Sequence, residues 1–151
     1  MTKIDKSLTA VGWRERIALP ELGIPTVVAK IDTGARTSCL HAFYVTPFED
    51  NGEQWVRFGI HPHQHDTDTE ITCAARIQDE RMISDSGGHK EMRYIISTLI
   101  SLGEKQWPIE LSLTNRDTMR FRMLLGRTAM GNIIVYPKKS FMLPQQTTIT
   151  D

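Results

Sequence analysis

The sequence predicts an all-β fold, either a barrel or a sandwich, from three observations. Apolar and polar residues alternate with a period of two in short runs that are rich in β-branched and aromatic residues. Clusters of Gly, Pro, Asn and Asp separate these runs, as turns do. No run has the periodicity of a long amphipathic helix. The runs expected as strands are residues 11–20, 26–31, 53–60, 70–77, 92–102, 107–113 and 119–125.

One short helix is expected after the last of these runs. It would begin near Arg127 and end at Gly131 and Asn132, which are residue types that commonly end helices. Within the run 119–125, alternation would place apolar side chains on one face and two arginines on the other. We expect this basic face to be solvated rather than to bind phosphate. The alternating residues are Met119, Phe121 and Met123 against Thr118, Arg120 and Arg122.

The length and charge of the chain limit the classes of function. Its 151 residues favour one domain spanning residues 1–151, with a core of about 11–142 and a loose tail from about Pro144. Eighteen basic residues balance eighteen acidic ones, so a general nucleic-acid or anionic-membrane binder is not expected, although local patches stay open. No stretch approaches the roughly 18 apolar residues of a membrane span, and no signal peptide is visible, which predicts a cytoplasmic protein.

The two cysteines are too few for a disulfide scaffold. Reduced thiols are therefore expected, although a single Cys39–Cys73 bridge stays open. Cys39 and His41 lie two residues apart on an expected strand and would share one face. Because no third group orients them, we favour a small buried thiol over a nucleophile.

Asp32 occupies an unusual position at the end of an apolar run. Val27, Val28, Ala29 and Ile31 form an expected buried strand, and strand composition resumes in "TSCLHAF" after residue 36. The tripeptide Asp-Thr-Gly therefore lies on a tight loop between two strands. Its glycine would allow close approach of a neighbouring chain or ligand.

Three segments together resemble the retropepsin-like aspartic peptidases. They are the apolar strand with "DTGA" (residues 32–35), a glycine-bearing hairpin "RMISDSGGHKEMR" (81–93) and "MLLGR" (123–127). The segments "KIDTGARTSCLHA" and "NRDTMRFRMLLGR" more closely resemble a bacterial subfamily found with ATP-grasp glutamate ligases. Members of this subfamily are also labelled ATP-dependent zinc proteases. The resemblance covers about residues 11–142.

This resemblance implies a retropepsin-like closed barrel, the acid-protease fold, with one short C-terminal helix. It implies an aspartic endopeptidase without a cofactor, acting on a peptide or protein substrate and functionally linked to an ATP-grasp glutamate ligase. The expected catalytic residues are Asp32, Thr33 and Gly34, and the expected substrate-binding residues are Ala35, Arg36, Ser86, Gly87 and Gly88. Gly126 and Arg127 are expected to support the site structurally, and the same role is expected for Arg116.

A homodimer is expected because the chain has a single Asp-Thr-Gly. Peptide hydrolysis by carboxylates needs one ionised and one protonated group, and two carboxylates about 3 Å apart share one proton. No other aspartate in the sequence is followed by Thr-Gly or Ser-Gly. An isologous dimer with Asp32 of each copy at the two-fold axis supplies the pair, with activity at acid to near-neutral pH.

The hairpin from Met82 to Met92 matches the position of the family's flap. Small residues at its tip suit a lid that closes over an extended peptide, although a plain surface hairpin is the alternative. The tip "SDSGGHKE" is more polar than the flaps of viral retropepsins, which indicates a different class of substrate.

Two other functions stay open. One is a non-catalytic module of the same fold that binds a peptide, such as a glutamate-modified one, or a ligase partner. The other is a zinc-dependent peptidase that uses His61, His63 and His65, which would share a face of an extended strand. Because Pro62 interrupts the strand and no H-E-x-x-H motif is present, we favour no metal site, and we favour a solvated loop for the acidic segment 66–70.

Overall fold

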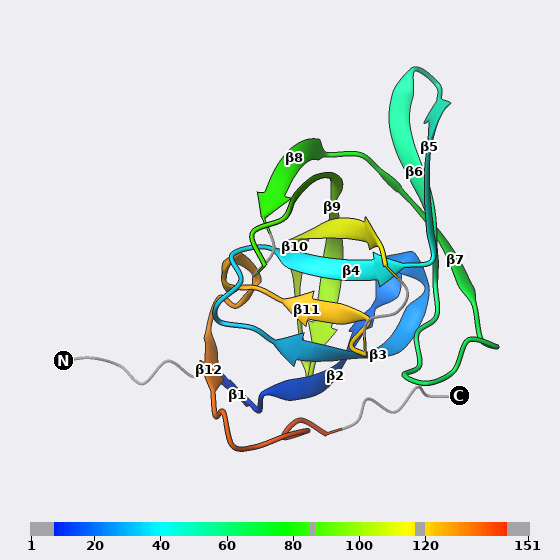
Figure 1. Ribbon diagram of the computed structural model, residues 1–151. Helices are drawn as coiled ribbons and strands as arrows, with labels where there is room; N and C mark the ends of the chain where they lie inside the picture. Colours follow the sequence, from blue (N-terminus) through cyan, green and yellow to red (C-terminus); the bar gives the residue numbers. More distant parts are fainter. Residues whose placement is uncertain (1–7, 85–86, 117–119, 145–151) are drawn as a thin grey trace.

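The computed structural model describes residues 8–84, 87–116 and 120–144 (Figure 1). Ser86, Thr118 and Met119, which were named in the sequence-based expectations, lie outside these residues. The described chain is built from short strands and two single-turn 3-10 helices. In chain order, the elements are β1 (Thr9–Val11), β2 (Arg14–Leu19), η1 (Pro20–Leu22), β3 (Ile24–Ile31), β4 (Ser38–Ala42), β5 (Tyr44–Asp50), β6 (Glu53–Ile60), β7 (Ile71–Arg76), β8 (Asp79–Ser84), β9 (Lys90–Leu102), β10 (Lys105–Asn115), β11 (Met123–Leu125), η2 (Arg127–Ala129) and β12 (Ile133–Val135).

Six strands close into a barrel, which confirms the predicted fold class. Their order around the ring is β10, β4, β11, β3, β2 and β9, and the antiparallel pairing of β9 with β10 closes it. Strand β8 pairs only with β9 and extends outside the ring. The expected short helix after residue 125 is the 3-10 helix η2. Closure leaves few free strand edges, which suits a small all-β domain.

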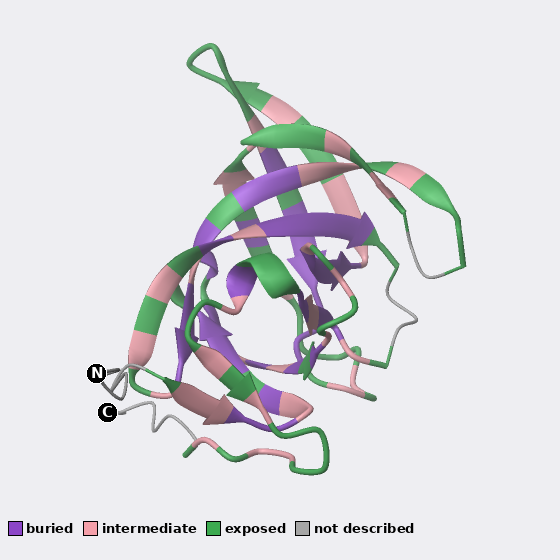
Figure 2. Cartoon of the chain, turned by 90° about the vertical axis from the view of Figure 1, so that its left-hand side faces the viewer, coloured by how far each residue is buried: buried purple, intermediate pink, exposed green. Residues whose placement is uncertain are grey.

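The core follows the predicted alternation of the strands. In β3, Ile24, Val27, Ala29 and Ile31 are buried, whereas Lys30 is exposed. Figure 2 shows the buried residues gathered on the barrel strands and the exposed residues on the projecting turns. Each fully buried Leu, Ile or Phe side chain contributes about 1.5–3 kcal/mol relative to its exposed state. The largest fully buried side chains are Leu19, Ile24, Leu40, Phe58, Ile60, Ile95, Ile96, Ile100, Leu102, Leu111, Met123 and Leu125.

Strand β11 lies between the two strands that flank the Asp32 loop. It runs parallel to β3 and antiparallel to β4, with Met123 opposite both Ala29 and Leu40. The expected strand 119–125 is wrong at its beginning, because the strand starts only at Met123. The prediction of a solvated basic face is also wrong for Arg122, which is 6% exposed and donates a 3.0 Å hydrogen bond from Nε to the carbonyl oxygen of His61. An arginine can be buried in this way when backbone carbonyls accept its protons.

A three-stranded sheet of β5, β6 and β7 stands beside the barrel. The hairpin of β5 and β6 projects from the body of the molecule (Figure 1). One side of this sheet packs on the core through Val56, Phe58 and Cys73, and the other carries a stacked pair of Phe48 and Trp55. Cys39 and Cys73 are both free and buried, which confirms the expected thiols.

The segment after β12 is fastened to the barrel by a buried carboxylate. Glu15 on β2 is 1% exposed, and its two oxygens accept hydrogen bonds from the amides of Gly12, Met142 and Leu143 at 2.7–3.2 Å. The side chain of Phe141 lies under the guanidinium groups of Arg14 and Arg16. The chain is thus held as far as Leu143. Within the described ranges, no helix has the length and apolar character needed to cross a bilayer.

Candidate active site

The Asp32 loop begins where the buried strand β3 ends. The amide of Asp32 donates a 2.9 Å hydrogen bond to the carbonyl oxygen of Leu125 on β11, and the amide of Ala35 donates to the carbonyl oxygen of Asp32 at 3.2 Å. The carboxylate atom Oδ1 accepts a 3.0 Å hydrogen bond from the amide of Gly34. A side chain at position 34 would place its Cβ 3.3 Å from this oxygen, so glycine lets the amide reach the carboxylate.

The next turn of chain is joined to this loop by backbone and side-chain hydrogen bonds. The amide of Arg127 donates to the carbonyl oxygen of Ala35 at 2.8 Å, and the amide of Thr128 donates to that of Arg36 at 3.0 Å. The guanidinium Nη1 of Arg127 donates to the carbonyl oxygen of Thr33 at 2.9 Å. Hydrogen bonds from the 3-10 helix η2, as well as those within the loop, therefore fix the conformation of the Asp32 loop.

Gly126 marks the closest approach between the two segments. A Cβ at this position would lie 2.7 Å from the carbonyl carbon of Thr37 and 2.9 Å from its oxygen, distances that real Cβ atoms do not reach. Its amide donates a 3.0 Å hydrogen bond to the hydroxyl of Ser38, which is fully buried. The carbonyl oxygen of Ser38 in turn accepts a 2.9 Å hydrogen bond from the hydroxyl of Ser112 on β10. The base of the loop is thus fixed to three strands.

The tip of the loop faces outward. Thr33, Gly34 and Arg36 are exposed, and Asp32 is half-buried. Among the described residues, the Gly34 amide is the one hydrogen-bond partner of the Asp32 carboxylate. A single chain therefore presents one carboxylate at an exposed loop, which is half of the pair that a two-carboxylate hydrolysis needs.

The predicted flap hairpin is formed by β8 and β9. The two strands pair antiparallel from Asp79 opposite Ile95 to Ser84 opposite Lys90. Gly87 and Gly88 lie in its turn, and Gly88 adopts a φ of 83° that favours glycine. The exposed pair Met82 and Met92 marks one face of this hairpin. The other face turns towards β4 and β10.

Arg81 ties this hairpin to the barrel wall. Its Nη1 and Nη2 donate to the two carboxylate oxygens of Glu110 on β10 at 2.8 and 3.0 Å, and its Nε donates to Asp79 at 2.8 Å. These hydrogen bonds hold the pKa of Glu110 below its ordinary value, and the charge of Arg36 on the Asp32 loop adds to the effect. Sequence reasoning missed Arg81 and Glu110 as site residues, because they are 29 residues apart and only the fold brings them together.

A second cluster lies on β4, the strand that follows the Asp32 loop. Cys39 Sγ is 4.0 Å from His41 Nδ1, and that nitrogen lies 2.7 Å from the hydroxyl oxygen of Thr114. Arg93 of the hairpin directs Nη1 to Cys39 Sγ at 3.7 Å. Burial raises the pKa of Cys39, so the thiol stays protonated. This is the small buried thiol that the sequence predicted, with Arg93 as an unforeseen neighbour.

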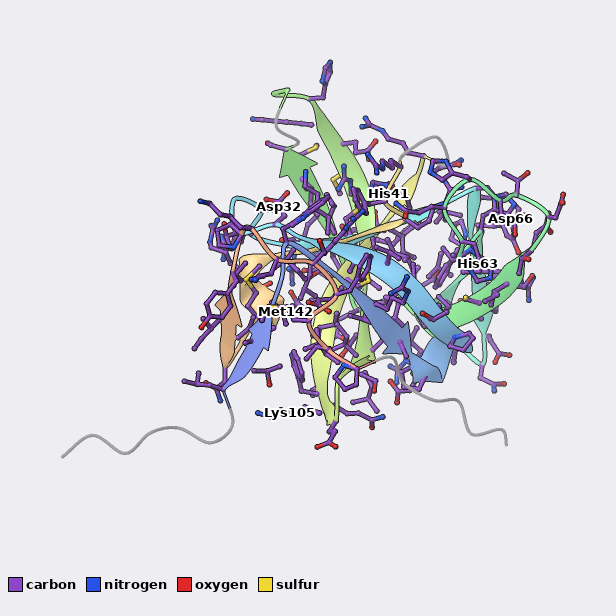
Figure 3. All side chains as sticks on the ribbon, turned by 90° about the horizontal axis from the view of Figure 1, so that it is seen from below. Asp32, His41, His63, Asp66, Lys105 and Met142 are labelled. Carbon is purple, nitrogen blue, oxygen red and sulfur yellow. The ribbon has the colours of Figure 1, made fainter. Side chains whose placement is uncertain are left out.

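The three histidines of the proposed zinc alternative do not form a strand face. They lie in the connection between β6 and β7, where His61 is buried and stacks on Phe43 at 4.1 Å, while His63 and His65 are exposed. No group of three His, Cys, Asp or Glu side chains in the described part of the chain is placed to hold a metal ion. Figure 3 shows His63 and Asp66 well away from Asp32, so this loop and the Asp32 loop are separate features.

The family of the chain follows from a comparison of its sequence with protein-family models. Residues 10–146 match the RimB-like family, described as "Retropepsin-like aspartic endopeptidase RimB". The chain belongs to the RimB-like family. This confirms the retropepsin-like assignment that the Asp-Thr-Gly, hairpin and Gly-Arg segments suggested.

Curated relatives of this RimB-like chain carry a different name. It is 46% identical over 140 residues to a probable alpha-L-glutamate ligase of Shewanella halifaxensis, and 47% identical over 131 residues to one of Desulfotalea psychrophila. These alignments cover 92% and 87% of the chain but only 31% and 28% of the relatives. The RimB-like chain therefore spans less than a third of the length of the curated relatives it matches.

A solved structure has the same fold. It is the crystal structure of Lpg0085, a protein of unknown function (DUF785) from Legionella pneumophila. The TM-score is 0.75 at 28% identity, and the match covers 90% of the RimB-like chain and 98% of the other. The barrel thus belongs to an architecture that crystallography has already shown.

Proposed function

We propose that the protein is an aspartic endopeptidase whose active form is a homodimer with one Asp32 from each copy. The observation that carries the proposal is the position of the Asp32 carboxylate. It lies on an exposed loop that the Gly34 amide and the η2 segment hold in place, and among the described residues that amide is its one hydrogen-bond partner. The family supports the peptidase class.

The chemistry needs only the two carboxylates and a water molecule. The ionised Asp32 takes a proton from water as the water oxygen bonds to the peptide carbonyl carbon. The protonated Asp32 of the other copy donates its proton to the carbonyl oxygen. Collapse of the tetrahedral intermediate breaks the C–N bond. The carboxyl group that took the water proton gives it to the leaving amine, and the other carboxylate takes a proton from a hydroxyl group of the intermediate. The products are a carboxylic acid and an amine, and the pair returns to one shared proton.

The hairpin and the loop supply the contacts to the substrate in this proposal. Ala35 and Arg36 follow the catalytic aspartate directly, and the hairpin turn with Gly87 and Gly88 closes over the bound peptide. Gly126 and Arg127 support the Asp32 loop structurally through the contacts described above. Thr33, which is exposed beside Asp32, braces the equivalent loop of the second copy.

We further propose that the substrate is an acidic peptide. The hairpin face that turns towards β4 and β10 carries Arg93, and the Asp32 loop adds Arg36, whereas Arg81 on the same face is paired with Glu110. Basic side chains near the reacting bond favour acidic side chains on the substrate. The relatives are named probable alpha-L-glutamate ligases, so peptides that carry added glutamate are the natural candidates, with a functional link to such a ligase.

Mixing experiments test the shared site. Asp32→Asn should lower peptide hydrolysis by at least about 1,000-fold and should abolish inhibition by pepstatin. When wild-type and Asp32→Asn chains are unfolded together and refolded, activity should follow the square of the wild-type fraction, because only dimers with two aspartates act. Asp50→Asn, at an exposed strand end, is the matched control and should leave activity unchanged. Activity that follows the wild-type fraction linearly, or survives in Asp32→Asn, contradicts the proposal.

A further inference from the structure

Two arginines face each other across the flap hairpin. Arg81 on β8 is directly opposite Arg93 on β9, and both contact the barrel wall. Like charges in directly opposed positions destabilise a hairpin unless carboxylates compensate them. The two arginines differ in how far this compensation goes.

Arg81 is already paired with two carboxylates, which use three of its five N–H donors. Both of its terminal nitrogens are used by the two oxygens of Glu110, and its Nε is used by Asp79. Such a bidentate pair, with a second carboxylate on the remaining edge, satisfies the guanidinium group. Arg81 is therefore an anchor of the hairpin.

The positive charge of Arg93 is compensated much less than that of Arg81. Its side chain is 9% exposed, its Nε donates to Glu91 at 2.8 Å, and its Nη1 points to the sulfur of Cys39 at 3.7 Å. A thiol is a weak acceptor, and the raised pKa of Cys39 keeps it uncharged. Among the described residues, no oxygen accepts a hydrogen bond from the terminal nitrogens of Arg93.

Three guanidinium groups act on His41 at this wall. The charges of Arg93, Arg116 and Arg122 lower the pKa of His41, and the charge of Glu91 raises it. Together with burial, which is the larger cause, the arginines lower the pKa of His41 to about 4, so the imidazole is neutral at pH 7. His41 Nε2 is buried and has no hydrogen-bond partner in the described chain. This wall therefore combines the guanidinium group of Arg93 with a neutral imidazole whose Nε2 is unpaired within the described chain.

We propose that Arg93, against the wall formed by Cys39 and His41, is the residue that selects an acidic side chain of the substrate, and that Glu91 occupies it in the free enzyme. This assignment rests on the proposed peptidase function. Strand β4 begins at Ser38, immediately after the Asp32 loop, so a peptide lying over Asp32 has its neighbouring side chains at this wall. The planar fork of the guanidinium group matches a carboxylate, and the substrate's carboxylate displaces that of Glu91.

The test compares two peptides that differ in one side chain. In a set of otherwise identical peptides, each position on either side of the cleaved bond carries Glu or Gln in turn, and kcat/KM is measured for each. Wild type should prefer Glu over Gln at one position by about 10–100-fold. Arg93→Lys keeps the charge but loses the fork, and it should reduce this ratio about tenfold at that position alone. Glu91→Gln should lower KM for the Glu peptide several-fold.

Arg81→Lys is the matched control, because it makes the same replacement on the opposite residue of the same hairpin. It should leave the Glu/Gln ratio unchanged. The assignment is overturned if Arg81→Lys and Arg93→Lys reduce the Glu/Gln ratio equally. It is also overturned if Arg93→Lys lowers kcat/KM equally for the Glu and Gln peptides. Binding of the same peptides to Asp32→Asn, followed by fluorescence anisotropy, separates the two proposals. A Glu/Gln difference that Arg93→Lys removes upholds the subsite even if wild type hydrolyses nothing, whereas no difference in binding or in cleavage rejects it.

Discussion

The amide of Gly126 donates a 3.0 Å hydrogen bond to the buried hydroxyl of Ser38. This bond joins β11, which precedes η2, to the first residue of β4, which follows the Asp32 loop. Both ends of the loop are therefore fixed to β11 and the glycine that follows it, with Leu125 accepting from the Asp32 amide at the other end. A catalytic carboxylate that must meet a second copy within about 0.5 Å of the productive geometry needs such a rigid base.

Gly126→Ala should disturb this base. The new Cβ would lie 2.7 Å from the carbonyl carbon of Thr37, so the loop must shift, and overpacking of this kind costs about 1–3 kcal/mol. Urea unfolding should show that loss, and kcat should fall more than KM changes. Gly52→Ala is a suitable reference, because a Cβ at position 52 would lie in open space. This substitution costs only the backbone strain of a φ of 78°, about 1–2 kcal/mol. If both variants keep full activity, the loop does not depend on the close approach at Gly126.

Glu15→Gln should loosen the segment that ends at Leu143. Three amides donate to the buried carboxylate, and an amide side chain offers one acceptor oxygen and presents its NH₂ group to a donor. The free energy of unfolding should fall by about 1.5–3 kcal/mol. Glu53→Gln, which breaks only the exposed pair with Arg76, should change it by less than about 1 kcal/mol. Equal effects in thermal unfolding would show that Glu15 does not hold the segment.

The free energy of unfolding should decrease as the pH is lowered from about 6.5 to about 4, because of His41. The pKa of His41 is about 4 in the folded protein and 6.5 in a model peptide, so the unfolded chain binds more protons in this window. The unfolded state is therefore favoured progressively as pH falls, by about 3 kcal/mol across the window. Denaturant unfolding at pH 4, 5, 6 and 7 measures this slope. His41→Gln should flatten it, and an unchanged slope would mean that His41 is not held neutral.

The pair of Arg81 and Glu110 should stabilise the hairpin measurably but weakly. Both side chains are about 40% exposed, so solvent screens their attraction despite the bidentate geometry. A double-mutant cycle with Arg81→Ala and Glu110→Ala should give a coupling energy of about 0.5–1 kcal/mol in urea unfolding. A coupling energy of zero would show that this pair does not anchor β8 to β10.

Much of the fold was predictable because burial has a period of two along these strands. The alternation in residues 26–31 and 53–60 matches β3 of the barrel and β6 of the adjacent sheet, whose inward side chains pack in the core. Strand β5, with Pro47 and mostly exposed residues, has no such alternation, and β1 and β12 have only three residues each. Arg122 misled the prediction because a carbonyl acceptor in a distant loop, at His61, decides its burial.

The candidate site was predictable where it is local in sequence. The Asp-Thr-Gly loop and the Gly126–Arg127 step are contiguous motifs, and the structure brings them together. The contact of Arg93 with Cys39 joins residues 54 apart, and only the curvature of the hairpin over β4 creates it. The sequence pattern alone does not indicate that two residues this far apart come into contact. The contact to which we assign substrate selection is therefore visible only in the folded structure.

The central claim is that two Asp32 side chains form one catalytic pair. A crystal structure of the active homodimer tests it most directly, through the distance between the nearest carboxylate oxygens of the two Asp32 residues. We predict about 3 Å, the separation at which two carboxylates share a proton. An active dimer in which the two side chains lie too far apart for a shared proton, or an active enzyme that crystallises and sediments as a monomer, would contradict the claim.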